Sequence, residues 1–144
     1  MKLIVSTLLF FLASCQTTPV PIEEADLVPP DRLFAYEVPT EKATATIEVI
    51  RDRGSISADC HIGVFLNYQL VARIDPGERA RFMIEPGTTT VGAGRDPRGE
   101  ELCGTDQYNV EHVETTLAKG ETQRFRVSTS AFGRIHILPI ALTP

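Results

Sequence analysis

From Ala43 onward, apolar side chains recur at every second position in a series of short runs. A period of two is typical of half-buried β-strands, because successive side chains of a strand point to opposite faces of the sheet. The runs are separated by short glycine- or proline-containing segments, and none has the 3.6-residue period of a helix. We therefore predict an all-β chain over residues 42–144, folded as a single antiparallel β-sandwich of about seven strands.

Several of the connecting segments have the chemistry of tight turns. Asp75-Pro76-Gly77-Glu78, Glu85-Pro86-Gly87 and Ala118-Lys119-Gly120-Glu121 combine residues that favour turns, among them glycine, which accepts a left-handed backbone. Asn67-Tyr68 is predicted to be a two-residue hairpin turn, since Asn tolerates a positive φ. Tyr68 stands where such a turn usually has Gly, which favours a longer or bulged connection instead.

The succession of strands and turns over residues 63–78, followed by the segments 85–87 and 117–122, resembles the PEGA-like domains of small bacterial envelope proteins. The resemblance covers about residues 43–128. It implies a small β-sandwich of the prealbumin or immunoglobulin type. Many lipoproteins of this kind have no assigned activity, so the resemblance implies a fold more than a function.

The first fifteen residues predict export. Lys2 precedes an almost uninterrupted apolar run from Leu3 to Leu12, too short to span a bilayer but of the length found in secretory signal peptides. Two small residues then precede Cys15. This arrangement resembles the lipobox of bacterial lipoproteins, and it implies that residues 1–14 are a signal peptide and that Cys15 is acylated. The alternative is an ordinary cleaved signal peptide followed by a spare cysteine.

The residue after this cysteine, Gln16, bears on the membrane that would hold the protein. In lipoproteins that follow the usual sorting rule, Asp at this position retains the protein in the inner membrane. Gln16 therefore implies the outer membrane of a diderm bacterium, with the protein facing the periplasm. The expected partners are the membrane, through the lipid anchor, and an envelope protein.

Residues 15–41 are predicted to be an acidic, proline-rich tether. They carry five prolines, and six acidic residues against Arg32 alone, a net charge of -5. Prolines at this density cannot continue a helix or a sheet ladder, which favours an extended spacer. Leu33, Phe34, Tyr36 and Val38 form an apolar cluster within it, either a strand or strap packed on the domain or a segment that binds a partner.

The charge of the remaining chain makes nucleic acid an unexpected partner. Residues 42–144 carry thirteen acidic and twelve basic residues, a net charge of -1. A nearly neutral domain on an acidic tether has no long-range attraction for a phosphate backbone.

Cys60 and Cys103 are the cysteines that remain once Cys15 is lipidated. In an oxidising compartment an even pair of this kind favours a disulfide. The competing hypothesis is a metal site that uses Cys60 and His61, but two adjacent ligands without a second pair are a weak zinc pattern. We expect no metal and no cofactor.

No combination of nucleophile and base in the sequence predicts an enzyme. Cys60 beside His61 would need a free thiolate, which a disulfide removes. Glu111 and His112 should point to opposite faces of one strand. Gly92-Ala93-Gly94 lacks the Lys-Ser/Thr ending and the helix of a phosphate-binding loop.

A glycine-rich, charged loop over residues 94–102 is the candidate binding surface, because long loops without regular structure are often functional. Arginines outside it, on the strands, also fit the simpler role of keeping a sheet soluble. The sequence thus predicts a membrane-anchored envelope lipoprotein that acts as a non-enzymatic binding or scaffolding module. The alternative is an inhibitor or accessory subunit of a periplasmic enzyme or secretion machine that acts through this loop. The candidate binding residues are Arg95, Asp96, Arg98 and Glu100.

Overall fold

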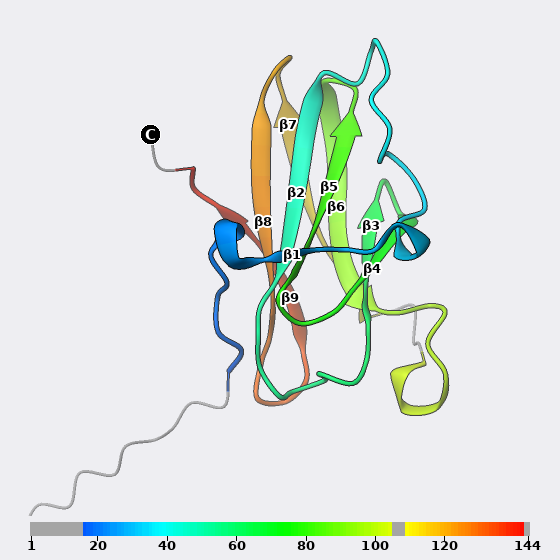
Figure 1. Ribbon diagram of the computed structural model, residues 1–144, viewed down its shortest axis with the longest axis vertical. Coiled ribbons are helices and arrows are strands. Elements are labelled where there is room, and N and C mark those ends of the chain that lie inside the picture. The colour runs from blue at the N-terminus through cyan, green and yellow to red at the C-terminus, as the bar shows by residue number, and fades with distance from the viewer. Residues whose placement is uncertain (1–15, 105–108, 143–144) are drawn as a thin grey trace, which may run out of the picture.

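The computed structural model describes residues 16–104 and 109–142. Over these residues the chain forms nine β-strands and three short 3-10 helices, without an α-helix (Figure 1). The all-β prediction is confirmed, and the expected number of about seven strands is too low. The strands are β1 (Asp26–Leu27), β2 (Ala45–Arg51), β3 (Ile62–Leu66), β4 (Gln69–Ile74), β5 (Glu78–Ile84), β6 (Gly87–Arg95), β7 (Glu111–Leu117), β8 (Thr122–Thr129) and β9 (Ile135–Ile140).

The strands make two sheets, with the orders β1-β5-β2-β8-β9 and β4-β3-β6-β7. Two pairings in the first sheet are parallel, β1 with β5 and β2 with β8, so the expectation of a purely antiparallel arrangement is wrong there. The reason is topological. The chain leaves β2, builds β3 to β7, and returns as β8 in the same direction beside β2, which only a long crossover allows.

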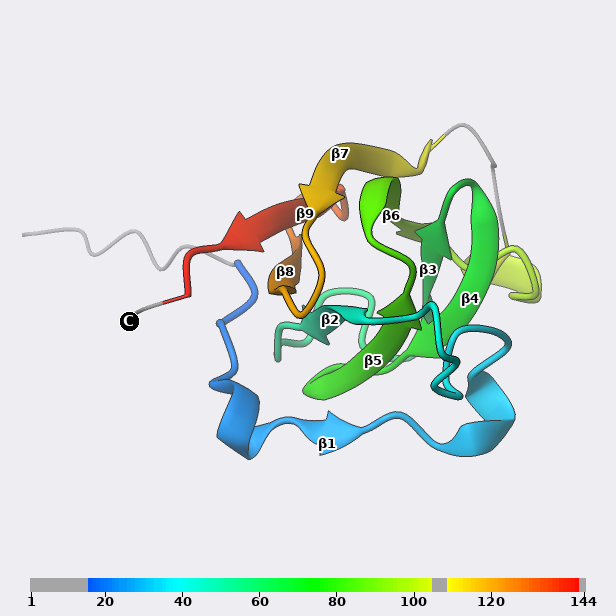
Figure 2. The same cartoon turned by 90° about the horizontal axis from the view of Figure 1, so that it is seen from above.

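One hydrophobic core lies between the two sheets, which face each other when seen from above (Figure 2). The apolar alternation in the sequence correctly predicts residues of this core, since Ile47 and Val49 of β2 and Phe82 of β5 are fully buried. The second sheet contributes Val64, Val71 and Val91, among others, to the same cluster. Burial of large apolar side chains from both sheets is the main force that holds them together.

Residues 16–36, called the strap below, do not form the expected free spacer. The strap crosses the outer side of the first sheet and reaches the second, as the blue segment below β2 and β5 in Figure 2 shows. Along it, Val20, Ala25 and Val28 are buried, and Leu33 forms a β-bridge with Ala72. These contacts confirm the packed alternative for Leu33. Prolines prevent long regular pairing, but the isolated apolar residues between them still bury surface.

The hairpin turn between β3 and β4 has two residues, as predicted. Asn67 and Tyr68 both adopt left-handed conformations, with φ values of 48° and 66°. The longer connection that Tyr68 favours is therefore wrong, although the β3–β4 pair does contain a bulge-type register shift, between Val64 and Phe65. A tyrosine at this position carries backbone strain on the order of 1–2 kcal/mol.

Candidate binding site

The Cys60–Cys103 disulfide is present, as predicted, with 5.3 Å between the two Cα atoms. It joins the β2–β3 connection to 3-10 helix η3 (Glu101–Cys103). Because both sulfurs are bonded to each other, neither is available as a thiolate nucleophile or as a metal ligand. This overturns the Cys60–His61 metal alternative.

Arg51 holds the same end of the molecule together from inside. Its guanidinium donates hydrogen bonds to the carbonyl oxygens of Cys60 (2.7 Å), Ile74 (2.8 Å) and Ser57 (2.7 Å). Burial lowers the pKa of Arg51 to about 10, against a weaker opposing effect of Asp75 and Glu78, so it remains charged at neutral pH. Its role is structural, because its donors are directed at the chain's own carbonyl groups.

A cluster of charged side chains lies near the disulfide, where Arg32 of the strap meets the turn between β4 and β5. Arg32 donates two hydrogen bonds to Glu78, at 2.9 and 2.6 Å, and lies 3.2 Å from Asp75. His61 Nδ1 is 2.5 Å from Asp75. Bidentate pairing of this kind fixes the strap in place. The charged groups of the cluster are paired with one another rather than directed at a ligand.

The residues predicted for the 94–102 loop have separate roles. Arg95 is the last residue of β6 rather than a loop residue, and its side chain is exposed. Asp96 is 1 % exposed, accepts a hydrogen bond from Arg73 at 2.7 Å, and also accepts one from the backbone N–H of Arg98 at 2.8 Å. Asp96 therefore supports the fold and cannot face a partner. Glu100 is exposed, at the start of η3.

Arg98 lies over the ring of Phe34, 3.9 Å from its centroid. This cation–π contact joins the predicted loop to the strap, and such contacts contribute on the order of 0.5–1 kcal/mol at exposed sites. Arg98 thus serves the packing of the strap, and of the four predicted residues Arg95 has the clearest place in a binding surface.

An apolar groove of about 350 Å³ lies on the outer face of the second sheet. It combines aromatic and aliphatic side chains with one cation, and its lining draws on β3, the β3–β4 turn, β4, the end of β6 and the start of β7. Concave, mainly apolar surfaces with a few polar groups are the usual form of a binding site. The lining residues are Phe65, Tyr68, Leu70, Arg95, Pro97, Val110 and His112.

Glycines form the floor beside this groove. Gly63 of β3 is paired directly with Gly94 of β6, and Phe65 is paired with Gly92. A Cβ at Gly92 would lie 2.6 Å from His112, and one at Gly94 would lie 2.6 Å from the side chain of Val110. The absence of side chains at these positions lets the lining residues lie flat against the strands.

Tyr68 and His112 meet at one wall of the groove, with ring centroids 4.8 Å apart. Tyr68 remains 73 % exposed in spite of this contact. The strained turn thus places an aromatic ring where it gains little burial. Strain that brings no stability to the fold is a feature of functional positions.

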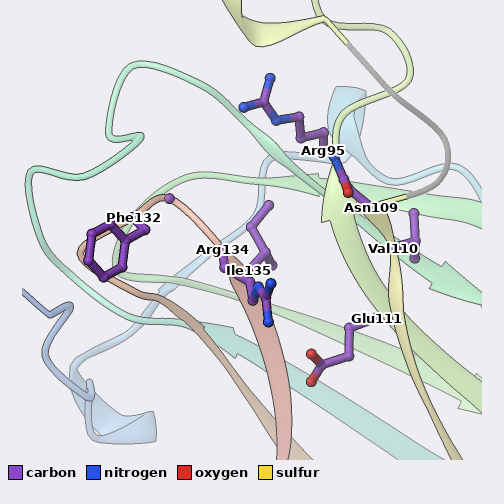
Figure 3. Close-up of a pocket in the computed structure, with 8 residues that line it drawn as sticks. Arg95, Asn109, Val110, Glu111, Phe132, Arg134 and Ile135 are labelled. Atoms are coloured by element: carbon purple, nitrogen blue, oxygen red, sulfur yellow. The ribbon is translucent and has the colours of Figure 1, made fainter.

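A second hollow, of about 550 Å³, lies where β6, β7 and the β8–β9 turn come together (Figure 3). Glu111 projects into it from β7, but its carboxylate already accepts the backbone N–H of Ile137 at 3.2 Å and lies 3.0 Å from His136 Nδ1. As the alternation predicts, Glu111 and His112 point to opposite faces. Because this hollow is lined mostly by polar groups, the apolar groove is the better candidate site.

The groove was not predicted from the sequence, although the glycines of β3 and β6 beside it could have indicated it. Gly63, Gly92 and Gly94 all occupy the outward positions of their strands, where a solvated sheet normally carries polar side chains. The residues that cover them come from separate strands and can be assigned only once the strand order is known.

Residues 16–104 and 109–142 contain no group of three or more potential ligands placed to hold a metal ion. They also contain no helix with the length and apolar character needed to cross a bilayer.

No family model matches this chain, and the search of curated proteins found no match to it.

Proposed function

We propose that this chain is a lipoprotein of the bacterial cell envelope, acylated at Cys15 and held at the outer membrane facing the periplasm, and that its domain binds a partner without catalysing a reaction. We further propose that the two sheets form a β-sandwich of the prealbumin or immunoglobulin type, as in PEGA-like domains. The anchor is supported by the lipobox-like sequence that ends at Cys15. The binding role is supported by the groove.

The main support for a binding role is the conformation and exposure of Tyr68. It is held in a left-handed conformation and is largely exposed, and it lines the apolar groove beside His112. Arg95 lines the same groove. A partner that places an apolar side chain in the groove and a carboxylate near Arg95 would satisfy both features. An envelope protein or peptide segment has this chemistry.

A non-enzymatic role is supported by how the reactive groups are used. Among the described residues, Cys60 and Cys103 are bonded to each other, and two of the three histidines lie against carboxylates. The third, His112, lies against the ring of Tyr68 in a tilted arrangement, with 46° between the two ring planes. Nucleophilic catalysis by a cysteine would need a thiolate within hydrogen-bonding reach of a base, and none of these histidines has a cysteine thiolate to activate.

The test is capture of envelope proteins by the full-length lipoprotein and by its Tyr68→Gly variant. Glycine accepts φ values near 66° without strain, so we expect Tyr68→Gly to be as stable as the parent or more stable by about 1 kcal/mol. We also expect it to lose the partner, because the aromatic wall is gone. Thermal unfolding and mass spectrometry of the captured proteins measure the two effects.

Asn67→Gly is the matched control, since it changes the other left-handed residue of the same turn and does not line the groove. We expect it to retain the partner. Equal capture by the parent, Tyr68→Gly and Asn67→Gly would contradict a binding role for the groove. Point variants are preferable to removal of residues 94–102, because such a deletion would also remove the buried Asp96.

A further inference from the structure

The start of the strap fixes how far the domain can lie from an anchor at Cys15. The backbone N–H of Thr18 donates to the carbonyl of Arg53 at 2.7 Å, and Thr17 Oγ1 donates to Asp52 at 2.9 Å. The backbone N–H of Thr129 in turn donates to Thr17 Oγ1, at 2.9 Å. Only Gln16 separates these contacts from Cys15. Consecutive Cα atoms are about 3.8 Å apart, so two residues of chain reach no further than about 8 Å from Thr17.

The β8–β9 hairpin lies beside this point, together with the segment 52–54. Gln16 and Thr17 share a hollow with Arg126 of β8 and Leu138 of β9. The hairpin exposes three large apolar side chains: Phe132 at its turn (98 % exposed), Leu138 (45 %) and Ile140 (37 %). Apolar side chains at a hairpin turn and along an edge strand are a liability in water unless another surface covers them.

The charges on this hairpin suit a lipid headgroup region. Arg126 is the cross-strand neighbour of Leu138, and Arg124 that of Ile140, so the arginines and the apolar residues share a face. The carboxylates that pair with these arginines lie beneath them. Asp52 is 1 % exposed and Glu48 is 9 % exposed, against 28 % for Arg126 and 34 % for Arg124. The two arginine side chains are therefore more exposed than the carboxylates that pair with them.

From these observations we infer that the domain lies directly on the membrane, with Phe132, Leu138 and Ile140 of the β8–β9 hairpin inserted into the headgroup and upper acyl region of the leaflet that holds the lipid of Cys15. The occupant of this apolar edge is thus the lipid surface. The inference rests on the proposed acylation. It also orients the domain, because η3, which carries the exposed Leu102, lies beside β4 on the other side of the molecule from β9 (Figures 1 and 2).

The sequence contains no tryptophan, so a single introduced tryptophan reports one position only. The full-length chain is purified from membranes as Leu138→Trp, Phe132→Trp or Leu102→Trp and reconstituted in phosphatidylcholine vesicles whose acyl chains carry bromine, a contact quencher. Leu102 is 91 % exposed and is the matched control. We expect about a twofold or greater loss of emission for Leu138→Trp and Phe132→Trp, as for side chains buried ~5–10 Å into the interface, and none for Leu102→Trp.

Incorporation of labelled palmitate is measured on the same preparations. Acylated protein in which both hairpin tryptophans emit as strongly as the one at position 102 would overturn the inference and leave the proposed anchor intact. Protein that carries no acyl group would overturn the anchor and the inference together. Two hairpin positions are used so that a folding defect in one variant does not decide the result.

Discussion

Replacing Cys60 and Cys103 together by alanine is expected to lower the free energy of unfolding by about 4 kcal/mol. The two cysteines are 43 residues apart, and their bond removes the many open conformations of that loop from the unfolded chain. Such a loss is a large share of the stability of a domain of this size, on the order of 5–15 kcal/mol. Denaturant unfolding under non-reducing conditions measures it.

The single variants Cys60→Ala and Cys103→Ala provide the control for this prediction. Each already breaks the bond, so each should cost about as much as the double variant. A double variant whose loss equals the sum of the two single losses would show that the sulfurs act independently and would contradict the bond.

Arg51→Met is expected to lower the free energy of unfolding by about 3 kcal/mol. The variant leaves the carbonyl oxygens of Ser57, Cys60 and Ile74 without their donor, and each unsatisfied buried group costs on the order of 1–3 kcal/mol. Removing the buried charge offsets part of that loss, because the desolvation that lowers the pKa of Arg51 is no longer required. Denaturant unfolding of parent and variant measures the difference.

Arg53→Met is the matched control, two residues away and outside β2. The Arg53 side chain is 51 % exposed, and its ion pair with Glu24 is 3.9 Å long. Exposed pairs of this kind contribute about 0–1 kcal/mol. Similar losses for Arg51→Met and Arg53→Met would refute the buried role assigned to Arg51.

The alternating runs allowed about seven of the nine strands to be predicted from sequence, because a strand that buries one face needs apolar residues at every second position. Strand β1 was not recognised, since it has two residues and both are exposed. The parallel pairing of β2 with β8 was also missed. Which strands become neighbours depends on contacts between distant parts of the chain, and a local pattern does not contain them.

The strap and the candidate site show a similar limit. The strap buries Val20, Ala25 and Val28, which follow neither a period of two nor one of 3.6. The prediction of a free spacer therefore rested on the prolines. Asp96 was assigned to a binding loop because Arg73, the residue that pairs with it in the fold, is 23 residues away in the sequence. The disulfide was predictable because only two cysteines remained to pair.

The most direct test of the account is the intact mass and N-terminal peptide of the protein purified from bacterial membranes, because the placement of the domain depends on the anchor. The account predicts a chain that lacks residues 1–14, begins at Cys15 and carries acyl groups on that residue. Mature protein that retains residues 1–14, or begins at another residue without acyl groups, would contradict it.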